Sequence, residues 1–350
     1  MSQGGTPRAG PRTEGEDEPP DGMLVRPHYH GEMGQDIGGN TVARRPLAEH
    51  PAWKRGLHAE SLASRMILPV VVSASVEDRE RVEGTGRLER LSLTELVRDA
   101  RAAASAGFAG LLLFGATDRK DARAFIASER DHIVPRAIRA VKEAVPELGI
   151  ATEVCVCAYT EHGQCVLFRD GSADVSGTLE RLGEIAVAHA DAGADLLIPS
   201  GMLDGSVAAV RRALTGEHDE VPVAAMAKLE STLYSMHRVL VDAARIRERA
   251  VPLLAADDPS ASRARALRDV AEGADAVVVQ PGTSALDIVV GLRPLVRRPL
   301  ISFHTADEHA AFIAAAEDLD GPAAERETLA ASRRAGADLV ISYGAWNAAD

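Results

Sequence analysis

The sequence predicts a (β/α)8 TIM barrel, with a doubly wound open sheet as the second choice. Apolar stretches of strand length recur along the chain, and helical patterns such as residues 93–107 separate them. Hydrophobic residues make up 46% of the chain and aromatic residues only 3%, a composition typical of helices packed on buried parallel strands. The expected strands are 66–72, 108–115, 150–157, 195–200, 222–227, 275–280, 299–303 and 338–343.

A weak internal repeat supports this strand assignment. The tetrapeptides at 192–195, 272–275 and 335–338 read Ala-Gly-Ala-Asp, Glu-Gly-Ala-Asp and Ala-Gly-Ala-Asp, and each one ends a helical pattern and enters an apolar run. Glycine suits the left-handed residue that stops a helix. A short turn then leads directly into a buried parallel strand, which is the connection that a β/α barrel repeats.

Composition excludes several classes of partner. The chain has 350 residues and a formal net charge of -13, which argues against nucleic acid or an anionic membrane as the partner. No apolar run reaches the roughly 18 residues of a membrane span. The N-terminus lacks the apolar centre of a signal peptide, so we expect a cytoplasmic protein.

Three regions are expected along the chain. Residues 1–40 are rich in Gly, Pro and charged residues and are predicted to be a disordered tail. Residues 41–65 mix Arg, Leu and Trp53 without a clear period, which indicates an arm that lies on another surface, such as a neighbouring subunit. Residues 66–350 form the predicted barrel domain.

The three cysteines of the chain fall within eleven residues. Cys155 and Cys157 close the expected strand 150–157, on the same side of it, and Cys165 follows in the loop. Three converging thiolates without a fourth suit a zinc ion with an open coordination position, as in catalytic sites. The alternative is three buried or reduced thiols without a metal. His162 could supply a fourth ligand, although a surface histidine is the favoured interpretation.

Polar residues at strand ends are the candidates for chemistry, because active sites of β/α barrels lie at the carboxyl ends of the strands. Lys228 follows the strand 222–227 directly, and desolvation there would lower the pKa of its amine, as an imine-forming nucleophile requires. The alternative is a lysine whose ammonium group reaches solvent. The strand-end candidates are Glu153, Cys155, Cys157, Ser200, Lys228, Gln280, His304 and Tyr343.

From about Arg44 to Ala345 the chain resembles the δ-aminolevulinic acid dehydratase (porphobilinogen synthase) family. The matching segments are ILPVVV, GLLLFGATDRKDA, EVCVCAYTEHGQC, AGADLLIPSGMLDG, AAMAKLESTLY and RAGADLVISYGA. The resemblance implies a barrel, an N-terminal arm that embraces a neighbouring subunit, and a homo-oligomer built from dimers up to an octamer. It also implies a zinc-dependent condensation of two 5-aminolevulinate molecules, with an additional magnesium ion in some relatives.

One half of the family's site has counterparts in this sequence. By resemblance, Lys228 is one of two imine-forming lysines, and Arg238 and Arg249 hold the carboxylate of the same substrate molecule. Glu153 stands where the family has Asp, and Leu253 where it has Gln. The remaining carried-over positions are Ser200 and Tyr343 in the active site and Cys155, Cys157 and Cys165 as zinc ligands.

The other half departs from the family. Gln280 stands in place of the second lysine, and a glutamine amide cannot form an imine. Ala306 stands in place of the serine that binds the other carboxylate, and Asp307 and His309 add a carboxylate and an imidazole nearby. These changes predict a remodelled pocket, lined by Gln280, Ala306 and His309, for a partner that is not covalently bound.

The sequence therefore predicts a diverged, zinc- and Schiff-base-dependent lyase. It is expected to condense an aminolevulinate-type amino-keto acid on Lys228 with a second small molecule, with loss of water. One alternative is an authentic but slow δ-aminolevulinic acid dehydratase that makes porphobilinogen for tetrapyrrole biosynthesis. Another is a non-catalytic paralogue that binds metal or a sister subunit.

Overall fold

Eight parallel strands form a barrel in the computed structural model, which describes Met1 and residues 47–85, 87–315 and 320–349. The barrel order is β8-β5-β4-β1-β12-β11-β10-β9, and a parallel bridge between Leu197 and Val223 joins the two outermost strands. This closure excludes the open sheet and confirms the predicted (β/α)8 barrel. The strands are β1 (Met66–Ser73), β4 (Gly110–Ala116), β5 (Gly149–Val154), β8 (Leu196–Pro199), β9 (Ala224–Lys228), β10 (Ala276–Gln280), β11 (Leu300–His304) and β12 (Leu339–Ser342).

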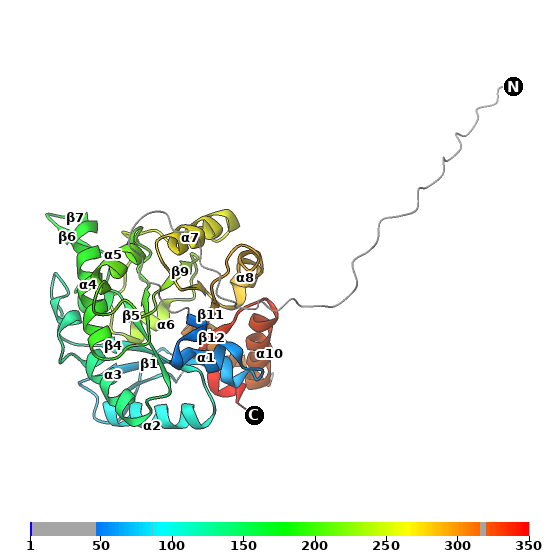
Figure 1. Cartoon of the computed structure of the whole chain (residues 1–350), viewed down its shortest axis with the longest axis horizontal. Helices are drawn as coiled ribbons and strands as arrows, with labels where there is room; N and C mark the ends of the chain where they lie inside the picture. Colours follow the sequence, from blue (N-terminus) through cyan, green and yellow to red (C-terminus); the bar gives the residue numbers. More distant parts are fainter. Residues whose placement is uncertain (2–46, 86, 316–319, 350) are drawn as a thin grey trace. The chain divides into compact units, whose positions relative to one another are not determined.

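Helices surround the strands, as Figure 1 shows. The expected helix over 93–107 is present as α2 (Leu93–Ser105), whose N-terminus is capped by Ser92. The other helices are α1 (Pro51–His58), α3 (Ile133–Ala144), α4 (Val175–Asp191), α5 (Ser206–Leu214), α6 (Ser235–Leu240), α7 (Pro259–Ala271), α8 (Leu286–Leu292), α9 (Ala306–Ala314) and α10 (Gly321–Arg334). Short strands lie in the connections: β2 (Arg79–Arg81), β3 (Glu89–Leu91), β6 (Leu167–Arg169) and β7 (Ser172–Asp174).

The repeated Gly-Ala-Asp motif has a structural role at each of its three positions. Gly193, Gly273 and Gly336 have φ values of 100°, 105° and 108° and end their helices, as the sequence predicts. The aspartate carboxylates accept hydrogen bonds from the backbone N–H of Ile150, Val223 and Leu300, at 2.9, 2.9 and 2.8 Å. Each aspartate therefore links its own strand to a neighbouring strand at the amino end of the barrel.

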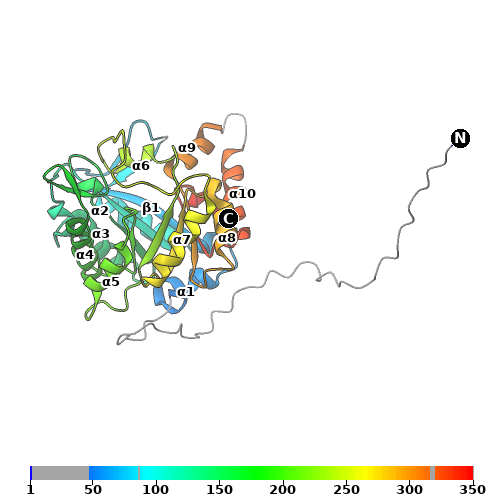
Figure 2. The ribbon, with the colours of Figure 1, turned by 90° about the horizontal axis from the view of Figure 1, so that it is seen from above.

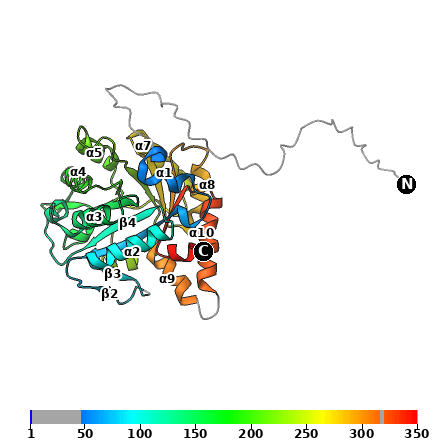
Figure 3. The same cartoon turned by 60° about the horizontal axis from the view of Figure 1, so that its bottom comes forward.

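Residues 47–65 pack on the barrel of their own chain. Trp53 is fully buried, and its indole Nε1 donates to the carbonyl of Asp195 at 3.0 Å. Its ring lies against Gly110 and Gly149, where any Cβ would come within 2.8 Å of ring carbons. Figure 2 shows α1 at the end of the barrel opposite α6 and α9, and Figure 3 again shows α1 and α9 on opposite sides. The described part of the predicted arm thus lies on the amino end of the barrel of its own chain. The rest of the arm and, apart from Met1, the predicted tail over 1–40 lie outside the described residues.

Two histidines are buried between the barrel and its outer helices. His189 on α4 pairs through Nδ1 with the Thr152 hydroxyl at 3.0 Å, whereas the two ring nitrogens of His132, before α3, have no hydrogen-bond partner among the described residues. Burial lowers the pKa of His132 to about 4, with Arg119 adding to the effect. Burial also lowers the pKa of His189 to about 3, with His132 contributing. Both rings are therefore neutral in the folded protein at neutral pH.

We expect the protein to lose stability when the pH falls below the pKa of about 6.5 that histidine has in an unfolded chain. The unfolded chain then binds protons at both histidines, and the folded protein does not until about pH 4 and pH 3. From pH 7 to 5.5 the two groups together should lower the free energy of unfolding by roughly 2.5 kcal/mol. Urea unfolding at both pH values measures this change.

The control for this prediction separates the two histidines from other titrating groups. A His132→Leu/His189→Leu double variant should lose most of the pH dependence, whatever its absolute stability. A variant of the exposed His58, His58→Ala, should keep it. An equal slope in all three proteins would contradict the assignment to His132 and His189.

Candidate active site

Polar side chains converge at the carboxyl ends of the strands. Lys228 ends β9 and pairs in register with Gln280, the last residue of β10. Glu153 and Ser200 come from β5 and the end of β8. These four residues line one common cavity, together with apolar residues of β4, β8 and β11. Four of the strand-end residues that the sequence identified are thus brought together at one site, whereas His304 is buried and pairs with the Ser332 hydroxyl at 2.7 Å.

Lys228 lies in a mostly enclosed position at this mouth. Its ammonium nitrogen is 4.3 Å from the centre of the Tyr234 ring, a cation–π distance. Burial lowers the pKa of Lys228, while the nearby acidic groups of Cys165 and Glu153 act in the opposite direction. The lowered pKa favours the neutral amine, which is the nucleophilic form.

Glu153 and Ser200 form a hydrogen-bonded pair. The Ser200 hydroxyl donates to the Glu153 carboxylate at 2.6 Å. Burial raises the pKa of Glu153, although this hydrogen bond and the charge of Lys228 oppose the rise. A carboxyl group with a raised pKa can hold or release a proton beside the lysine.

The three thiols form a cluster, but the strand that carries them is shorter than predicted. β5 ends at Val154, and Cys157 already belongs to a 3-10 helix over Cys157–Tyr159. The prediction of a strand through Cys157 is therefore wrong, and a turn of the loop brings the thiols together. The Cys155 and Cys157 sulfur atoms are 3.4 Å apart, and all three Sγ atoms lie within 4.8 Å of one another.

This geometry fits a thiolate-bound metal ion. A tetrahedral zinc site with Zn–S bonds of about 2.3 Å separates its sulfur atoms by about 3.8 Å. Hydrogen bonds from Cys155 and Cys157 lower the pKa of Cys165, and Lys228 and Arg238 contribute to the effect. Hydrogen bonds with Cys157 and Cys165, together with burial, raise the pKa of Cys155. The hydrogen bond with Cys155 acts to lower the pKa of Cys157, but the hydrogen bond with Cys165 and burial outweigh it and raise this pKa. The cluster can therefore carry a negative charge, which a bound cation would neutralise.

His162 is not part of the sulfur cluster. It is half-buried instead of lying on the surface. Its Nδ1 accepts a hydrogen bond from the Gln164 backbone N–H at 3.0 Å, and its ring packs edge-on against Phe168 with centroids 5.0 Å apart. Burial lowers its pKa. The ring therefore has a structural role in the loop between Cys157 and Cys165.

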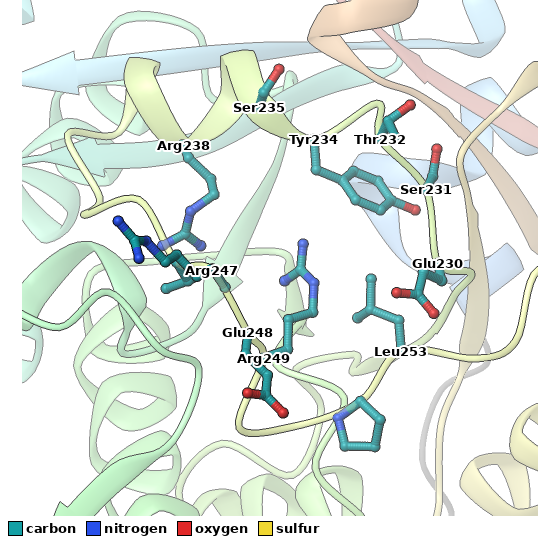
Figure 4. Close-up of a pocket in the computed structure, with 12 residues that line it drawn as sticks. Glu230, Ser231, Thr232, Tyr234, Ser235, Arg238, Arg247, Glu248, Arg249 and Leu253 are labelled. Carbon is teal, nitrogen blue, oxygen red and sulfur yellow. The ribbon is translucent and has the colours of Figure 1, made fainter.

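A cavity of about 460 Å³ lies between α6 and the segment 246–253 (Figure 4). Arg249 points toward Tyr234 inside it, with 5.9 Å between the guanidinium carbon and the ring centre, and Leu253 lines the same wall. Arg238 reaches in from α6 and donates to the carbonyls of Gly163, at 2.8 Å, and Ala244. Two guanidinium groups predicted to bind a carboxylate thus line one cavity.

The structure does not bring Ala306 and His309 into the cavities that Lys228 lines. Ala306 is fully buried at the start of α9. His309 is fixed by Glu325 of α10, whose two carboxylate oxygens lie 2.9 Å from Nδ1. Gln280 is the member of the predicted partner pocket that does line a cavity with Lys228. Tyr343 follows β12, and its buried hydroxyl has no hydrogen-bond partner among the described residues.

Two residues of the site are absent from the sequence prediction. Tyr234 faces the Lys228 ammonium group, and His237 on α6 lines two of the cavities that contain Lys228. Both lie in the long connection between β9 and α7, outside the predicted strand ends. The sequence signal that could have indicated this part of the site is His237 itself, a histidine placed between Lys228 and Arg238.

The fold and this convergence of groups define a β/α-barrel enzyme. A family model described as delta-aminolevulinic acid dehydratase matches residues 42–350. The chain belongs to the delta-aminolevulinic acid dehydratase family, and it is accordingly a lyase of the condensing type.

Curated relatives and a solved structure agree with this family. The delta-aminolevulinic acid dehydratase of Escherichia coli (strain K12) is 32% identical over 311 residues, which are 87% of this chain and 96% of the relative. That of Synechococcus elongatus is 38% identical over 275 residues, 74% of this chain and 82% of the relative. The Toxoplasma gondii ME49 enzyme, solved in complex with the reaction product porphobilinogen, superposes with a TM-score of 0.79 at 29% identity. The match covers 88% of this chain and 91% of that one.

The family also bears on the expected partners. The named relatives are enzymes of small-molecule metabolism, as the sequence predicts for this chain. Among the described residues no helix is both long and apolar enough to cross a membrane.

Proposed function

We propose that the protein binds 5-aminolevulinate, or a closely related amino-keto acid, as an imine on Lys228 and condenses it with a second molecule, with loss of water. The observation that carries this proposal is the position of Lys228, enclosed at the barrel mouth beside Glu153, the thiol cluster and an arginine-lined cavity. The family of the chain supports the same chemistry.

The covalent step uses the neutral amine that burial of Lys228 favours. The nitrogen attacks the ketone carbon of the substrate and forms a carbinolamine. The carbinolamine loses its hydroxyl group as water, and a C=N bond to Lys228 replaces the C=O bond. The protonated imine then makes the adjacent carbon acidic enough to lose a proton and form a new bond to the second molecule. Attack of water, or of an amine of the second molecule, on the C=N carbon finally releases the product and regenerates the Lys228 amine.

Glu153, supported by Ser200, is placed to transfer protons in this step. Its raised pKa allows the carboxyl group to protonate the leaving hydroxyl and then to accept the proton from the carbon. Burial raises the pKa of the Tyr343 hydroxyl, so this group acts as a hydrogen-bond donor and not as a base. Arg249 and Arg238 would hold the substrate carboxylate in the larger cavity.

Cys155, Cys157 and Cys165 would hold zinc, and the spacing and charge of the sulfur cluster support this assignment. Zinc bound there would supply Lewis-acid polarisation of a substrate oxygen or amine, or would activate a water molecule. The additional magnesium ion remains an expectation from the family.

Porphobilinogen is the product that the comparisons favour. The curated relatives described above carry the name delta-aminolevulinic acid dehydratase, and the solved relative contains porphobilinogen. The second substrate molecule would then be another aminolevulinate, held without a covalent bond near Gln280. The homo-oligomer and the cytoplasmic location are proposals with the same support from the family.

A second candidate is condensation with a different, noncovalently bound partner. Gln280 favours it, because the residue faces the cavity in register with Lys228 and offers an amide where an amine would be needed for a second imine. Both candidate functions require the imine on Lys228, and they differ in the second molecule that reacts with it.

A pyrrole colour assay with 5-aminolevulinate and the zinc-loaded protein tests the product. We expect slow porphobilinogen formation by the wild type and, in Gln280→Lys, a rise of at least about tenfold, because a second amine can then hold the other substrate. No pyrrole from either protein, with a trapped imine still present, would favour a different partner. No imine at all would contradict the proposed function.

A further inference from the structure

The connection between β9 and α7 carries a histidine that the proposed chemistry does not use. His237 lies on α6 and is half-buried. It lines the cavity that contains Lys228 and Gln280, and also the cavity that contains Lys228, Cys165 and Arg249. The imidazole therefore lies at the boundary between the two halves of the site.

The protein fixes the plane of this ring without satisfying its polar atoms. Phe114 of β4 packs edge-on against it, with centroids 4.6 Å apart and planes at 67°. No hydrogen bond joins either ring nitrogen to another residue in the described part of the chain. Burial lowers the pKa of His237 to about 3, and Lys228 and Arg238 add to the effect. A neutral imidazole offers one donor and one acceptor.

The helix that carries His237 is held at both ends. At its start, the Asp307 carboxylate on α9 accepts hydrogen bonds from the Ser235 hydroxyl at 2.6 Å and the Met236 backbone N–H at 3.1 Å. At its end, Arg90 of β3 donates to the carbonyls of Val239 and Leu240, both at 2.8 Å. An anion at the N-terminus and a cation at the C-terminus are the favourable arrangement for a helix dipole.

The contacts of Asp307 and Arg90 with the two ends of α6, called the clamp below, explain what Asp307 does. The sequence placed its charge in the pocket of a second substrate, whereas the structure directs the carboxylate to α6. The α6 segment presents Arg238 as well as His237 to the cavities around Lys228. Loss of the Asp307 contacts would therefore loosen the start of the helix that carries both side chains.

We propose that His237 is a further substrate-contacting residue, which hydrogen-bonds the molecule held on Lys228, and that Asp307 is the positioning residue that keeps it there through α6. This inference rests on the proposed function for its ligand. The ring lines the cavity that contains Lys228 and Gln280 and also the cavity that contains Lys228 and Cys165. Its two nitrogens are available for hydrogen bonds with a molecule bound there. An oxygen or amine on the bound amino-keto acid is the matching group.

Replacement of His237 by Phe tests the contact, because Phe keeps the ring that packs on Phe114 and removes both polar atoms. We expect kcat to fall on the order of 100-fold, while the borohydride-trapped imine on Lys228 still forms. His237→Gln restores a donor and an acceptor and should recover part of the loss. Wild-type kcat in His237→Phe, with unchanged thermal stability, would overturn the proposal.

Asp307→Ala tests the positioning role. We expect KM for 5-aminolevulinate to rise roughly tenfold and hydrogen exchange over residues 229–258 to become faster. Asp320→Ala is the matched control, because Asp320 also caps a helix, α10, with its carboxylate 3.1 Å from the Ala323 N–H. Equal effects of the two variants on KM and on exchange would show that Asp307 is only a helix cap.

The proposed function and the proposed role of Asp307 can be refuted by different results. If the wild type forms no imine with 5-aminolevulinate, the proposed function fails. Hydrogen exchange of Asp307→Ala against Asp320→Ala requires no turnover, and unchanged exchange over 229–258 would overturn the clamp even in an active enzyme.

Discussion

Replacing Lys228 by Ala is expected to lower the condensation rate by at least about 10³-fold, because the variant lacks the amine that forms the imine. The chain contains four lysines, Lys54, Lys120, Lys142 and Lys228. Of these, Lys228 is the one that lines the inner cavities described above, so no other described lysine can replace it there. The measurement is consumption of 5-aminolevulinate together with product formation.

Lys142→Ala is the control for this variant. Lys142 pairs with Asp195 at the amino end of the barrel, far along the strands from the site. It should keep wild-type turnover even if its stability falls slightly. Turnover retained by Lys228→Ala would refute the imine mechanism, whatever the identity of the product.

Replacing Cys157 by Ser is expected to reduce bound zinc from one per chain to less than about a tenth, because the hydroxyl is a far weaker ligand than the thiolate. Activity should fall with the metal by at least about 100-fold. Metal analysis after dialysis measures the first effect. His162→Ala should keep the zinc, because the His162 ring lies outside the sulfur cluster. Full zinc in Cys157→Ser would show that the three thiols are not the metal site.

The sequence predicted the barrel because its signals are local and repeated. Apolar runs mark the strands, and glycines with positive φ at 193, 273 and 336 mark the turns before three of them. The strand over 150–157 was predicted too long, because alternating β-branched residues continue through Val156. The chain nevertheless leaves the sheet after Val154, so that the thiols can converge. Local β propensity therefore does not decide where this strand ends.

The site was predictable where it lies at strand ends. Lys228, Glu153, Ser200 and Gln280 come from four strands, and the barrel alone brings them together. Tyr234 and His237 could not be found in this way, because the irregular connection after β9 places them and no periodicity describes it. For the same reason the partners of Asp307 and His309, which are Ser235 and Glu325, were not evident: contacts between helices of different β/α units leave no pattern in the sequence.

The most direct test of the account is borohydride reduction of the wild-type protein in the presence of 5-aminolevulinate, followed by intact mass measurement and peptide mapping. The account predicts one adduct per chain, located on Lys228, because Gln280 cannot supply a second imine. An adduct on another lysine, or no adduct with the zinc-loaded protein, would contradict it.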